Sequence, residues 1–263
     1  MLSVNGVLVP GTKVIPLPVL GKRNVTAYLL LGRRPVVVDS GVPGSGRKVY
    51  EQVAEQGVDP DDISVIVVTH GHIDHFGGAA ELSRLTGAPI AAHVGDLGQY
   101  TSGRVREPYL PTGSLGRLLA TLPPFHVRAE PFTPQVLVRG EMPLADYGID
   151  ARIVPTPGHT AGSVSVLTEA GDLVAGDLIA TPLLGLLPRL PWNPPFHDDP
   201  RANLASLRRM LDLGPERLHA GHGGMLDPGR VRRWVVKEQR RLERLEARGR
   251  LRLRMGDDVS GDA

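Results

Sequence analysis

Cysteine is absent from the 263 residues of the sequence. This excludes disulfide bonds and thiolate metal ligands, so any metal must be held by histidine, aspartate, glutamate or backbone oxygen. Such ligands suit zinc, iron or manganese. A chain of this length can bury a sizeable core without covalent cross-links, so their absence does not argue against a stable fold.

Long apolar segments are also missing. No run approaches the ~18 consecutive apolar residues of a membrane-spanning helix, so we expect no membrane span. Residues 1–6 lack the basic segment followed by an apolar one that marks a secretory signal peptide. These absences predict a cytoplasmic location.

Acidic residues are scarce in one segment, although the formal net charge of the whole chain is only +2. Residues 228–254 contain eleven Arg and Lys but three Glu, and the remainder of the chain is net acidic. A basic segment of this kind can contact nucleic acid or anionic lipid. The glutamates are interleaved among the arginines, which favours a solvated helix face, so we do not expect a nucleic-acid partner.

Strand-like and helix-like segments alternate along the chain without a dividing linker or an internal repeat, which predicts one α/β domain over residues 1–263. The expected strands are 12–20, 25–31, 35–39, 63–68, 89–93, 135–139, 151–154, 163–168, 172–175 and 217–219. The expected helices are 43–56, 76–85, 115–122, a segment that starts at 200, and one that starts at 228.

The segment Thr69-His70-Gly71-His72-Ile73-Asp74-His75 directly follows the expected buried strand 63–68. Open α/β folds place ligands at such strand ends. The first two histidines are two apart in an extended segment and can face one site, whereas Asp74 and His75 begin a helix and their side chains diverge. One loop can therefore serve two neighbouring metal ions. Burial of these groups without a metal would be costly.

Three later segments each place a single candidate ligand at a strand end beside glycine. They are Pro155–Thr160 with His159, Ala175–Asp177 with Asp177, and Ala220–Gly224 with His222. One such residue is weak evidence, but the ordered set indicates a metal site.

The ordered set resembles the metallo-β-lactamase superfamily, whose members carry a His-x-His-x-Asp-His loop followed by a His, an Asp and a His. The resemblance covers nearly the whole chain and implies a four-layer αββα sandwich. Val38-Asp39-Ser40-Gly41 also looks like the acidic turn that the family keeps under its metal site. The long interval between His75 and His159 departs from compact members of the family.

The resemblance implies two divalent metal ions, with zinc expected and iron or manganese as alternatives. It implies three sets of ligands: His70, His72 and His159 for one ion, Asp74, His75 and His222 for the other, and Asp177 bridging both. Asp39 would lie outside the set of ligands and would orient one of them. A hydroxide shared by the two ions would attack a carbonyl or phosphoryl centre, with Asp74 and Asp177 as the catalytic residues.

Two irregular segments, at about 94–130 and 181–197, are expected to be insertions beside this active site. The second combines apolar residues with five prolines, so it cannot form a regular helix or strand. It either packs over the core or lines a pocket. Whether Tyr100 and Tyr109 of the first segment, or His197 of the second, contact substrate is left open. His219 is expected in the core.

Hydrolysis of a carboxylic ester, lactone or thioester is the favoured activity, nearest in pattern to lactonase and glyoxalase II-like members. The apolar segment 181–197 can hold an acyl chain, which predicts a small-molecule substrate with an apolar portion. True β-lactamases generally lack the bridging aspartate that Asp177 supplies. A homodimer is left open.

Two other activities in the same superfamily are the alternatives. One is an iron-dependent oxidoreductase, either persulfide dioxygenase-like or di-iron, and the other is a phosphodiesterase or nuclease. The complete ligand set argues against a one-iron site, and no flavodoxin-like domain is visible to support a di-iron reductase. The inserted second domain usual in the nucleases is not visible either.

Overall fold

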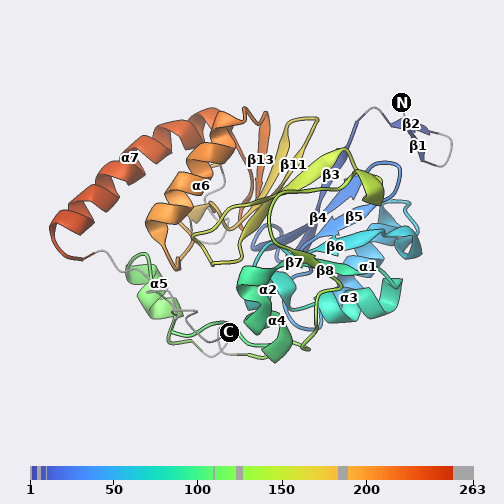
Figure 1. Ribbon diagram of the computed structural model, residues 1–263, viewed down its shortest axis with the longest axis horizontal. Helices are drawn as coiled ribbons and strands as arrows, with labels where there is room; N and C mark the ends of the chain where they lie inside the picture. Colours follow the sequence, from blue (N-terminus) through green and yellow to red (C-terminus); the bar gives the residue numbers. More distant parts are fainter. Residues whose placement is uncertain are drawn as a thin grey trace, which may run out of the picture.

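The computed structural model describes residues 2–4, 7–9, 11–108, 110–122, 127–182 and 189–250. Two six-stranded sheets pack face to face, and helices cover the outer surface of each (Figure 1). The predicted four-layer αββα sandwich is therefore confirmed. Tyr109 and parts of the two expected insertions, residues 123–126 and 183–188, lie outside the described residues.

The first sheet has the strand order β3-β4-β5-β6-β7-β8. The strands β3 to β5 pair antiparallel, and β5 to β8 pair parallel, so β5, β6 and β7 end at the same edge. Their bounds are β3 (Lys13–Leu20), β4 (Val25–Leu31), β5 (Val36–Val38), β6 (Val65–Val67), β7 (Ile90–His93) and β8 (Val136–Val138).

The second sheet has the order β14-β13-β12-β11-β10-β9. Only the β12–β13 pair in this sheet is parallel. The bounds are β9 (Met142–Pro143), β10 (Ala151–Pro155), β11 (Val164–Thr168), β12 (Asp172–Gly176), β13 (Arg217–Ala220) and β14 (Gly224–Leu226). A separate antiparallel pair joins β1 (Leu2–Val4) and β2 (Val7–Val9).

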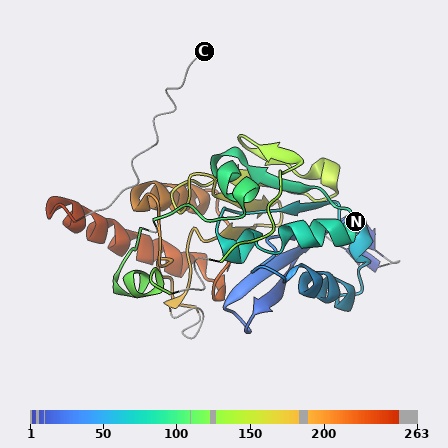
Figure 2. The same ribbon diagram turned by 90° about the horizontal axis from the view of Figure 1, so that it is seen from below.

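Helices α1 and α3 cover the first sheet, whereas α6 and α7 cover the second (Figures 1 and 2). The helices are α1 (Gly46–Glu55), α2 (Ile73–Phe76), α3 (Ala79–Thr86), α4 (Leu97–Ser102), α5 (Ser114–Leu119), α6 (Pro200–Asp212) and α7 (Pro228–Ala247). Among the described residues, none of these helices is long and apolar enough to cross a membrane. The short elements α4, β9 and β14 were not predicted from the sequence.

Three apolar clusters separate the four layers. In β5, Val37 packs in the cluster beneath α1 and α3, while Val36 and Val38 pack in the cluster between the two sheets. This alternation follows from the two-residue period of a strand. A third cluster lies beneath α6 and α7 and includes Leu207 and Val231. Burial of each such side chain contributes roughly 2 kcal/mol.

The two C-terminal helices begin at the predicted residues. The carboxylate of Asp199 accepts hydrogen bonds from the backbone N–H groups of Arg201 and Ala202, at 2.8 and 3.0 Å. Asp227 accepts one from Arg230 at 2.7 Å. In both cases a proline follows at the first helical position, where its missing N–H has no partner to lose. These caps fix where α6 and α7 start.

Candidate metal centre

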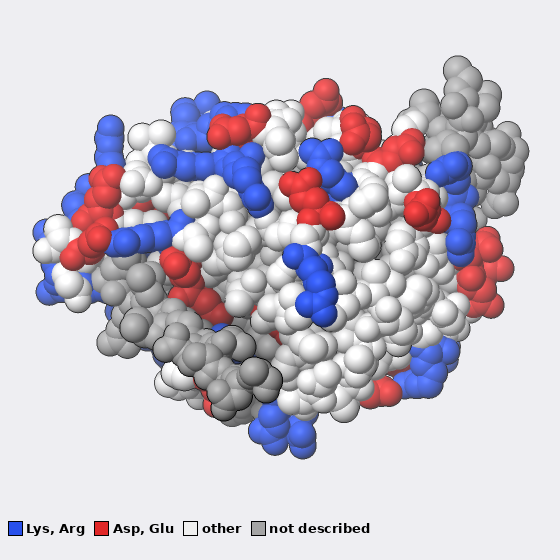
Figure 3. Space-filling view, viewed as in Figure 1, with Lys and Arg blue, Asp and Glu red and all other residues white. Residues whose placement is uncertain are grey.

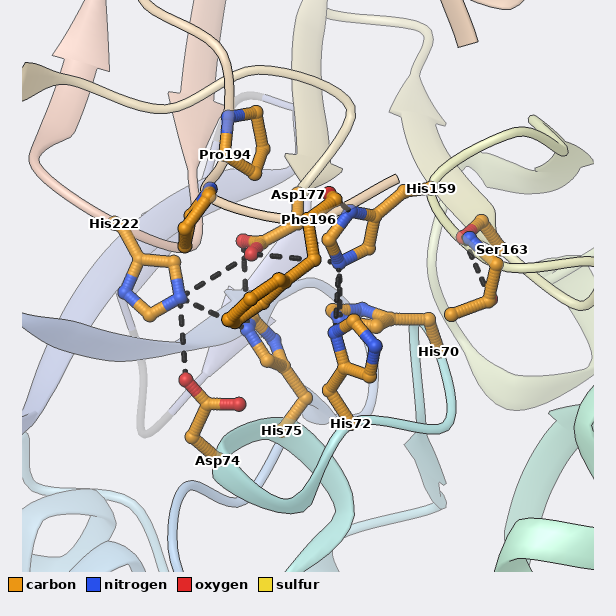
Figure 4. A network of polar contacts seen from close by, with 12 residues as sticks. His70, His72, Asp74, His75, His159, Ser163, Asp177, Pro194, Phe196 and His222 are labelled. Atoms are coloured by element: carbon orange, nitrogen blue, oxygen red, sulfur yellow. Dashed lines mark hydrogen bonds and ion pairs between the residues drawn. The ribbon is translucent and has the colours of Figure 1, made fainter. Parts of the chain in front are cut away.

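Four loops converge at one edge of the sandwich, each at the end of a strand. The loop 69–75 follows β6, the loop 156–163 follows β10, Asp177 follows β12, and the turn 221–223 follows β13. Figure 4 shows their side chains pointing toward a common centre. The strand β6 belongs to the first sheet, and the other three strands belong to the second. The candidate site is therefore built from loops of both sheets.

One group of candidate ligands consists of His70, His72 and His159, whose ligand atoms lie within 4.8 Å of one another. His159 Nε2 lies 3.1 Å from His70 Nε2 and 2.9 Å from His72 Nδ1. These are the three residues expected to share one ion.

A second group consists of Asp74, His75 and His222, again within 4.8 Å. His222 Nε2 lies 3.4 Å from His75 Nε2 and 3.3 Å from Asp74 Oδ2.

Asp177 lies between the two groups. Its Oδ1 is 3.4 Å from His75 Nε2, and its Oδ2 is 3.2 Å from His222 Nε2 and 3.6 Å from His159 Nε2. The structure therefore brings all seven predicted side chains together, and one carboxylate faces both groups.

The hydrogen bonds behind the histidines show that this donor set fits metal ions. His159 Nδ1 donates to the carbonyl of Phe196 at 2.9 Å, and His222 Nδ1 donates to the carbonyl of Asn24. Each bond places the ring proton on Nδ1, so the lone pair of Nε2 points into the centre. Among the described residues, Asp177 Oδ1 is buried without a hydrogen-bond partner. Converging lone pairs and an unpartnered carboxylate oxygen match the chemistry of a divalent cation site.

The electrostatics of the two groups differ. Burial lowers the pKa of His70 and of His159 well below the usual value, and neighbouring imidazoles lower it further. Burial would also lower the pKa of His75, but Asp177 and Asp39 outweigh it and raise that pKa to about 10. The pKa of His222 is raised for the same kind of reason, by Asp177 and Asp74. The second group therefore favours positive charge more strongly than the first.

A cavity of about 290 Å³ opens above the centre. Residues of both ligand groups form its floor, and the rest of its wall is apolar apart from Asn24. Leu119 and Val127, from the expected insertion at 94–130, and Phe196, from the segment 181–197, belong to that wall. The other apolar lining residues are Leu20, Val25, Val42, Pro43, Ile73 and Pro195.

The sequence profile of the metallo-β-lactamase superfamily matches residues 20–222, which include all seven candidate ligands. The chain belongs to this superfamily. A Bacillus subtilis (strain 168) protein described as a probable metallo-hydrolase is 28% identical over 207 residues, which cover 72% of this chain and 75% of the relative. A hydroxyacylglutathione hydrolase of Anaeromyxobacter dehalogenans (strain 2CP-C) is 31% identical over 159 residues, covering 60% of this chain and 47% of that enzyme.

Solved structures of the superfamily share the fold. A metallo-β-lactamase family protein from Thermus thermophilus superposes with a TM-score of 0.61 at 26% identity, covering 92% of this chain and 83% of the other. An archaeal superfamily protein from Sulfolobus tokodaii superposes with a TM-score of 0.60 at 22% identity, covering 96% of this chain and 92% of the other. The family and its curated relatives together place this chain in a superfamily of metallo-hydrolases.

In this superfamily member, Asp39 lies directly behind the centre. Its Oδ2 accepts hydrogen bonds from His75 Nδ1 and Thr69 Oγ1, both at 2.8 Å, and its Oδ1 accepts one from the Thr69 backbone at 2.8 Å. Thr69 Oγ1 in turn lies 3.0 Å from His70 Nδ1. Asp39 has a left-handed backbone with φ 63°. Such a conformation costs on the order of 1–3 kcal/mol. The three hydrogen bonds offset this cost and orient one histidine of each group.

Asp96 is a supporting residue that the sequence analysis did not single out. This fully buried carboxylate accepts hydrogen bonds from the backbone of Gly71 at 2.7 Å and of Gly162 at 2.9 Å, and from Thr160 Oγ1 at 2.6 Å. It therefore joins the loop 69–75 to the loop 156–163. Burial outweighs these bonds and raises the pKa of Asp96 to about 6. No local pattern marks such a residue, because its partners lie on other loops.

Gly221 shows how tightly the centre is built. A Cβ atom at this position would lie 2.5 Å from His75 Cε1 and 2.7 Å from Asp177 Oδ1. Both distances are shorter than any van der Waals contact, so only glycine fits between these two side chains.

Three residues outside the ligand set are buried. Tyr100 is fully buried and stacks on Phe132 with ring centroids 5.4 Å apart, so it does not reach the cavity. His197 is buried behind His159, with the two Nδ1 atoms 3.2 Å apart. His219 lies buried in β13, as expected, and its Nε2 is 2.7 Å from Asp172 Oδ1.

Proposed function

We propose that this chain is a dinuclear metallo-hydrolase that cleaves a carboxylic ester, lactone or thioester with an apolar portion. The observation that carries the proposal is the position of Asp177 between two groups of ligands, beneath a cavity with apolar walls. A carbonyl compound with an apolar acyl group matches both the floor and the walls of this cavity.

The two groups would each hold one ion. The first ion would be bound by His70, His72 and His159. The second ion would be bound by Asp74, His75 and His222, and Asp177 would bind both ions. Two divalent ions, proposed to be zinc, would supply Lewis acidity and would activate water for attack on the substrate carbonyl. The superfamily relation supports metal-dependent hydrolysis in general.

Asp74 has the position of a proton-transfer group. It lines the cavity, and 27% of its side chain is exposed, whereas 4% of the Asp177 side chain is exposed. Burial would raise the pKa of Asp74, but hydrogen bonding to His222 and the charge of His75 hold it well below its usual range. The ionised carboxylate can accept a hydrogen bond from the attacking water and orient it. A proton that it takes up is passed on readily to a leaving group, because the low pKa makes the protonated form a strong acid.

The apolar wall positions the substrate and excludes water. Ile73 comes from the same short helix as Asp74, and Phe196 is the residue whose carbonyl orients His159. An acyl group against these side chains would hold its carbonyl carbon over the floor of the cavity. The hydroxyacylglutathione hydrolase relative, a protein named for thioester hydrolysis, supports a thioester among the three bond types.

Metal content and turnover test the proposal together. Plasma mass spectrometry of the purified protein should find two equivalents of zinc per chain. A panel of lactones, aryl esters and thioesters should give turnover that Asp74→Asn lowers by about a hundredfold. A single equivalent of iron, without hydrolysis of any member of the panel, would contradict the proposal and favour an oxidoreductase. Turnover of a phosphodiester alone would favour a nuclease.

A further inference from the structure

A second cavity of about 1090 Å³ adjoins the metal centre on the side of α7. His222, Leu119 and Pro195 line both this groove and the smaller cavity, so the two meet at the metal centre. The groove is bounded by α5, by the segments 180–182 and 190–195, and by one face of α7. Figures 1 and 2 both show α5 beside α7.

The α7 side of the groove is strongly basic. Its basic lining residues are three or four positions apart and therefore share one helix face: Arg230, Arg233, Lys237, Arg241 and Arg244. The one acidic lining residue, Glu238, accepts hydrogen bonds from Arg241 at 2.6 Å and from Asn193 at 2.8 Å, so its charge is already balanced. Lys and Arg side chains are frequent over α7 and α6 in Figure 3.

Three of the basic side chains have no counterion among the residues that the structure describes. Within the described ranges, Arg233, Lys237 and Arg244 form no ion pair or hydrogen bond, and all three are exposed. Like charges along one helix face repel each other, so an anion in the groove would relieve this repulsion.

Two tryptophans complete the groove. Trp192 is 56% exposed, and Trp234 is partly buried against the cluster beneath α7. An exposed indole face can stack on a planar group such as a nucleobase. The groove therefore offers cations and aromatic faces, whereas the cavity above the metal centre offers mainly aliphatic side chains together with Phe196.

We propose that the substrate is an acyl ester or thioester whose leaving group carries phosphate groups. The acyl group occupies the apolar cavity, the phosphates lie along α7, and the scissile bond lies near His222, where the two cavities meet. Hydrolysis adds water across the carbonyl carbon–sulfur or carbon–oxygen bond, which yields a carboxylic acid and the phosphorylated thiol or alcohol. This inference rests on the proposed function and narrows its substrate class.

The apolar cavity argues against single-stranded nucleic acid as the ligand. A phosphodiester at the metal centre would place its charged backbone against aliphatic side chains such as Leu20, Val25 and Val42, at a cost in desolvation. An acyl chain has no such cost. A small neutral lactone is also disfavoured, because it would leave the basic groove without a ligand.

A matched pair of thioesters tests the inference. Octanoyl coenzyme A carries three phosphates on its leaving group, whereas the octanoyl thioester of N-acetylcysteamine has the same reacting bond and none. The kcat/KM of the metal-loaded protein should be at least about tenfold higher for the phosphorylated member, and the difference should shrink as salt is added. Arg233→Gln and Lys237→Gln should each lower this preference by about fivefold, mainly through KM.

The matched control is Arg208→Gln. Arg208 is an exposed residue of α6 that does not line the groove, so its replacement removes the same charge and should leave both kcat/KM values unchanged. Binding of free coenzyme A to the metal-free protein, measured by calorimetry, provides a readout that does not depend on turnover. It should weaken in Arg233→Gln and Lys237→Gln but not in Arg208→Gln.

The outcomes separate the two proposals. Equal kcat/KM values for the two thioesters, with no binding of coenzyme A, would overturn the phosphate groove and leave the hydrolase intact. Binding of coenzyme A that depends on Arg233, without hydrolysis of either thioester or of any lactone or aryl ester in the panel, would support the phosphate site and contradict the proposed function. A single-stranded oligonucleotide that binds more tightly than coenzyme A, through the same residues, would overturn the acyl substrate.

Discussion

At the scale of single residues, the geometry of the metal centre depends most on Asp177. Its two oxygens face three imidazole nitrogens from different loops, and among the described residues Oδ1 has no hydrogen-bond partner. The charges of His222 and His75 hold the pKa of this carboxyl well below its usual range, although burial would raise it. Asp177 therefore stays ionised, as the proposed bridging role requires.

Replacement of this carboxylate should separate the two metal sites. We expect Asp177→Asn to bind fewer than two zinc ions per chain and to lose about a hundredfold or more in kcat/KM, because an amide presents only one good oxygen ligand. Metal analysis and thioester turnover measure the two effects. Asp146→Asn, at an exposed position in the second half of the chain, is the control. Two tightly bound zinc ions and full turnover in Asp177→Asn would rule out the bridging role.

At the scale of elements, the loops that carry the ligands are held by carboxylates outside the ligand set. Asp39 ties the end of β5 to the loop 69–75, and Asp96 ties that loop to the loop 156–163. Neither residue lines the cavity above the centre. These two carboxylates position other residues. Their replacement should therefore lower the free energy of unfolding as well as the activity.

The raised pKa of Asp96 predicts a pH-dependent stability. Between the usual aspartate pKa of 3.8 and the folded value of about 6, folded Asp96 keeps a proton that the unfolded chain has lost. Stability from this group should therefore fall as pH rises through that window, by at most about 3 kcal/mol. Asp96→Asn cannot titrate, so the wild type should lose stability relative to this variant between pH 4 and pH 6. Urea denaturation of the metal-free proteins measures the difference.

The control for this experiment is again Asp146→Asn, whose stability should follow the wild-type pH dependence because that side chain is exposed. Parallel pH profiles for the wild type and Asp96→Asn would contradict the raised pKa.

The ligand loops could be predicted from the sequence, but their supports could not. In the loop 69–75, four candidate ligands lie within six residues after a buried strand. Each later candidate ligand follows a strand and lies beside glycine. Local spacing along the sequence is therefore enough to predict these loops. Asp96 acquires its role from backbone groups that only the folded chain brings near it. Tyr100 illustrates the same limit, because its burial against Phe132 depends on tertiary packing that residue type alone does not indicate.

At the scale of the whole molecule, the ligands are divided between the two sheets. His70, His72, Asp74 and His75 follow the first sheet, whereas His159, Asp177 and His222 follow the second. Bound ions would therefore connect the two halves of the sandwich at this edge. The α/β class could be anticipated because helix and strand periodicities are local, and the resemblance of the ligand set to the superfamily implied the four layers. The exact strand order required the structure.

Removal of the metal ions should lower the thermal stability of the whole domain. A ligand present at a thousand times its dissociation constant stabilises a folded protein by about 4 kcal/mol. For a domain of this size, that free energy corresponds to an increase of roughly 10 °C in Tm. We expect dialysis against a chelator to lower the Tm by that amount and added zinc to restore it, as measured by calorimetry. An unchanged Tm after verified loss of metal would show that the ions do not connect the two halves.

The division of the ligands along the chain also orders events during synthesis. The loop 69–75 leaves the ribosome early, but the first group of ligands is incomplete until His159 has emerged, and the second until His222 has emerged. A nascent chain thus carries the imidazoles of the loop 69–75 for the 84 positions that separate His75 from His159 without a complete group of ligands for either proposed ion. If the proposed dinuclear site forms, loading of its second ion would therefore be a late step, set by the metal that is available when the last strands of the second sheet have folded.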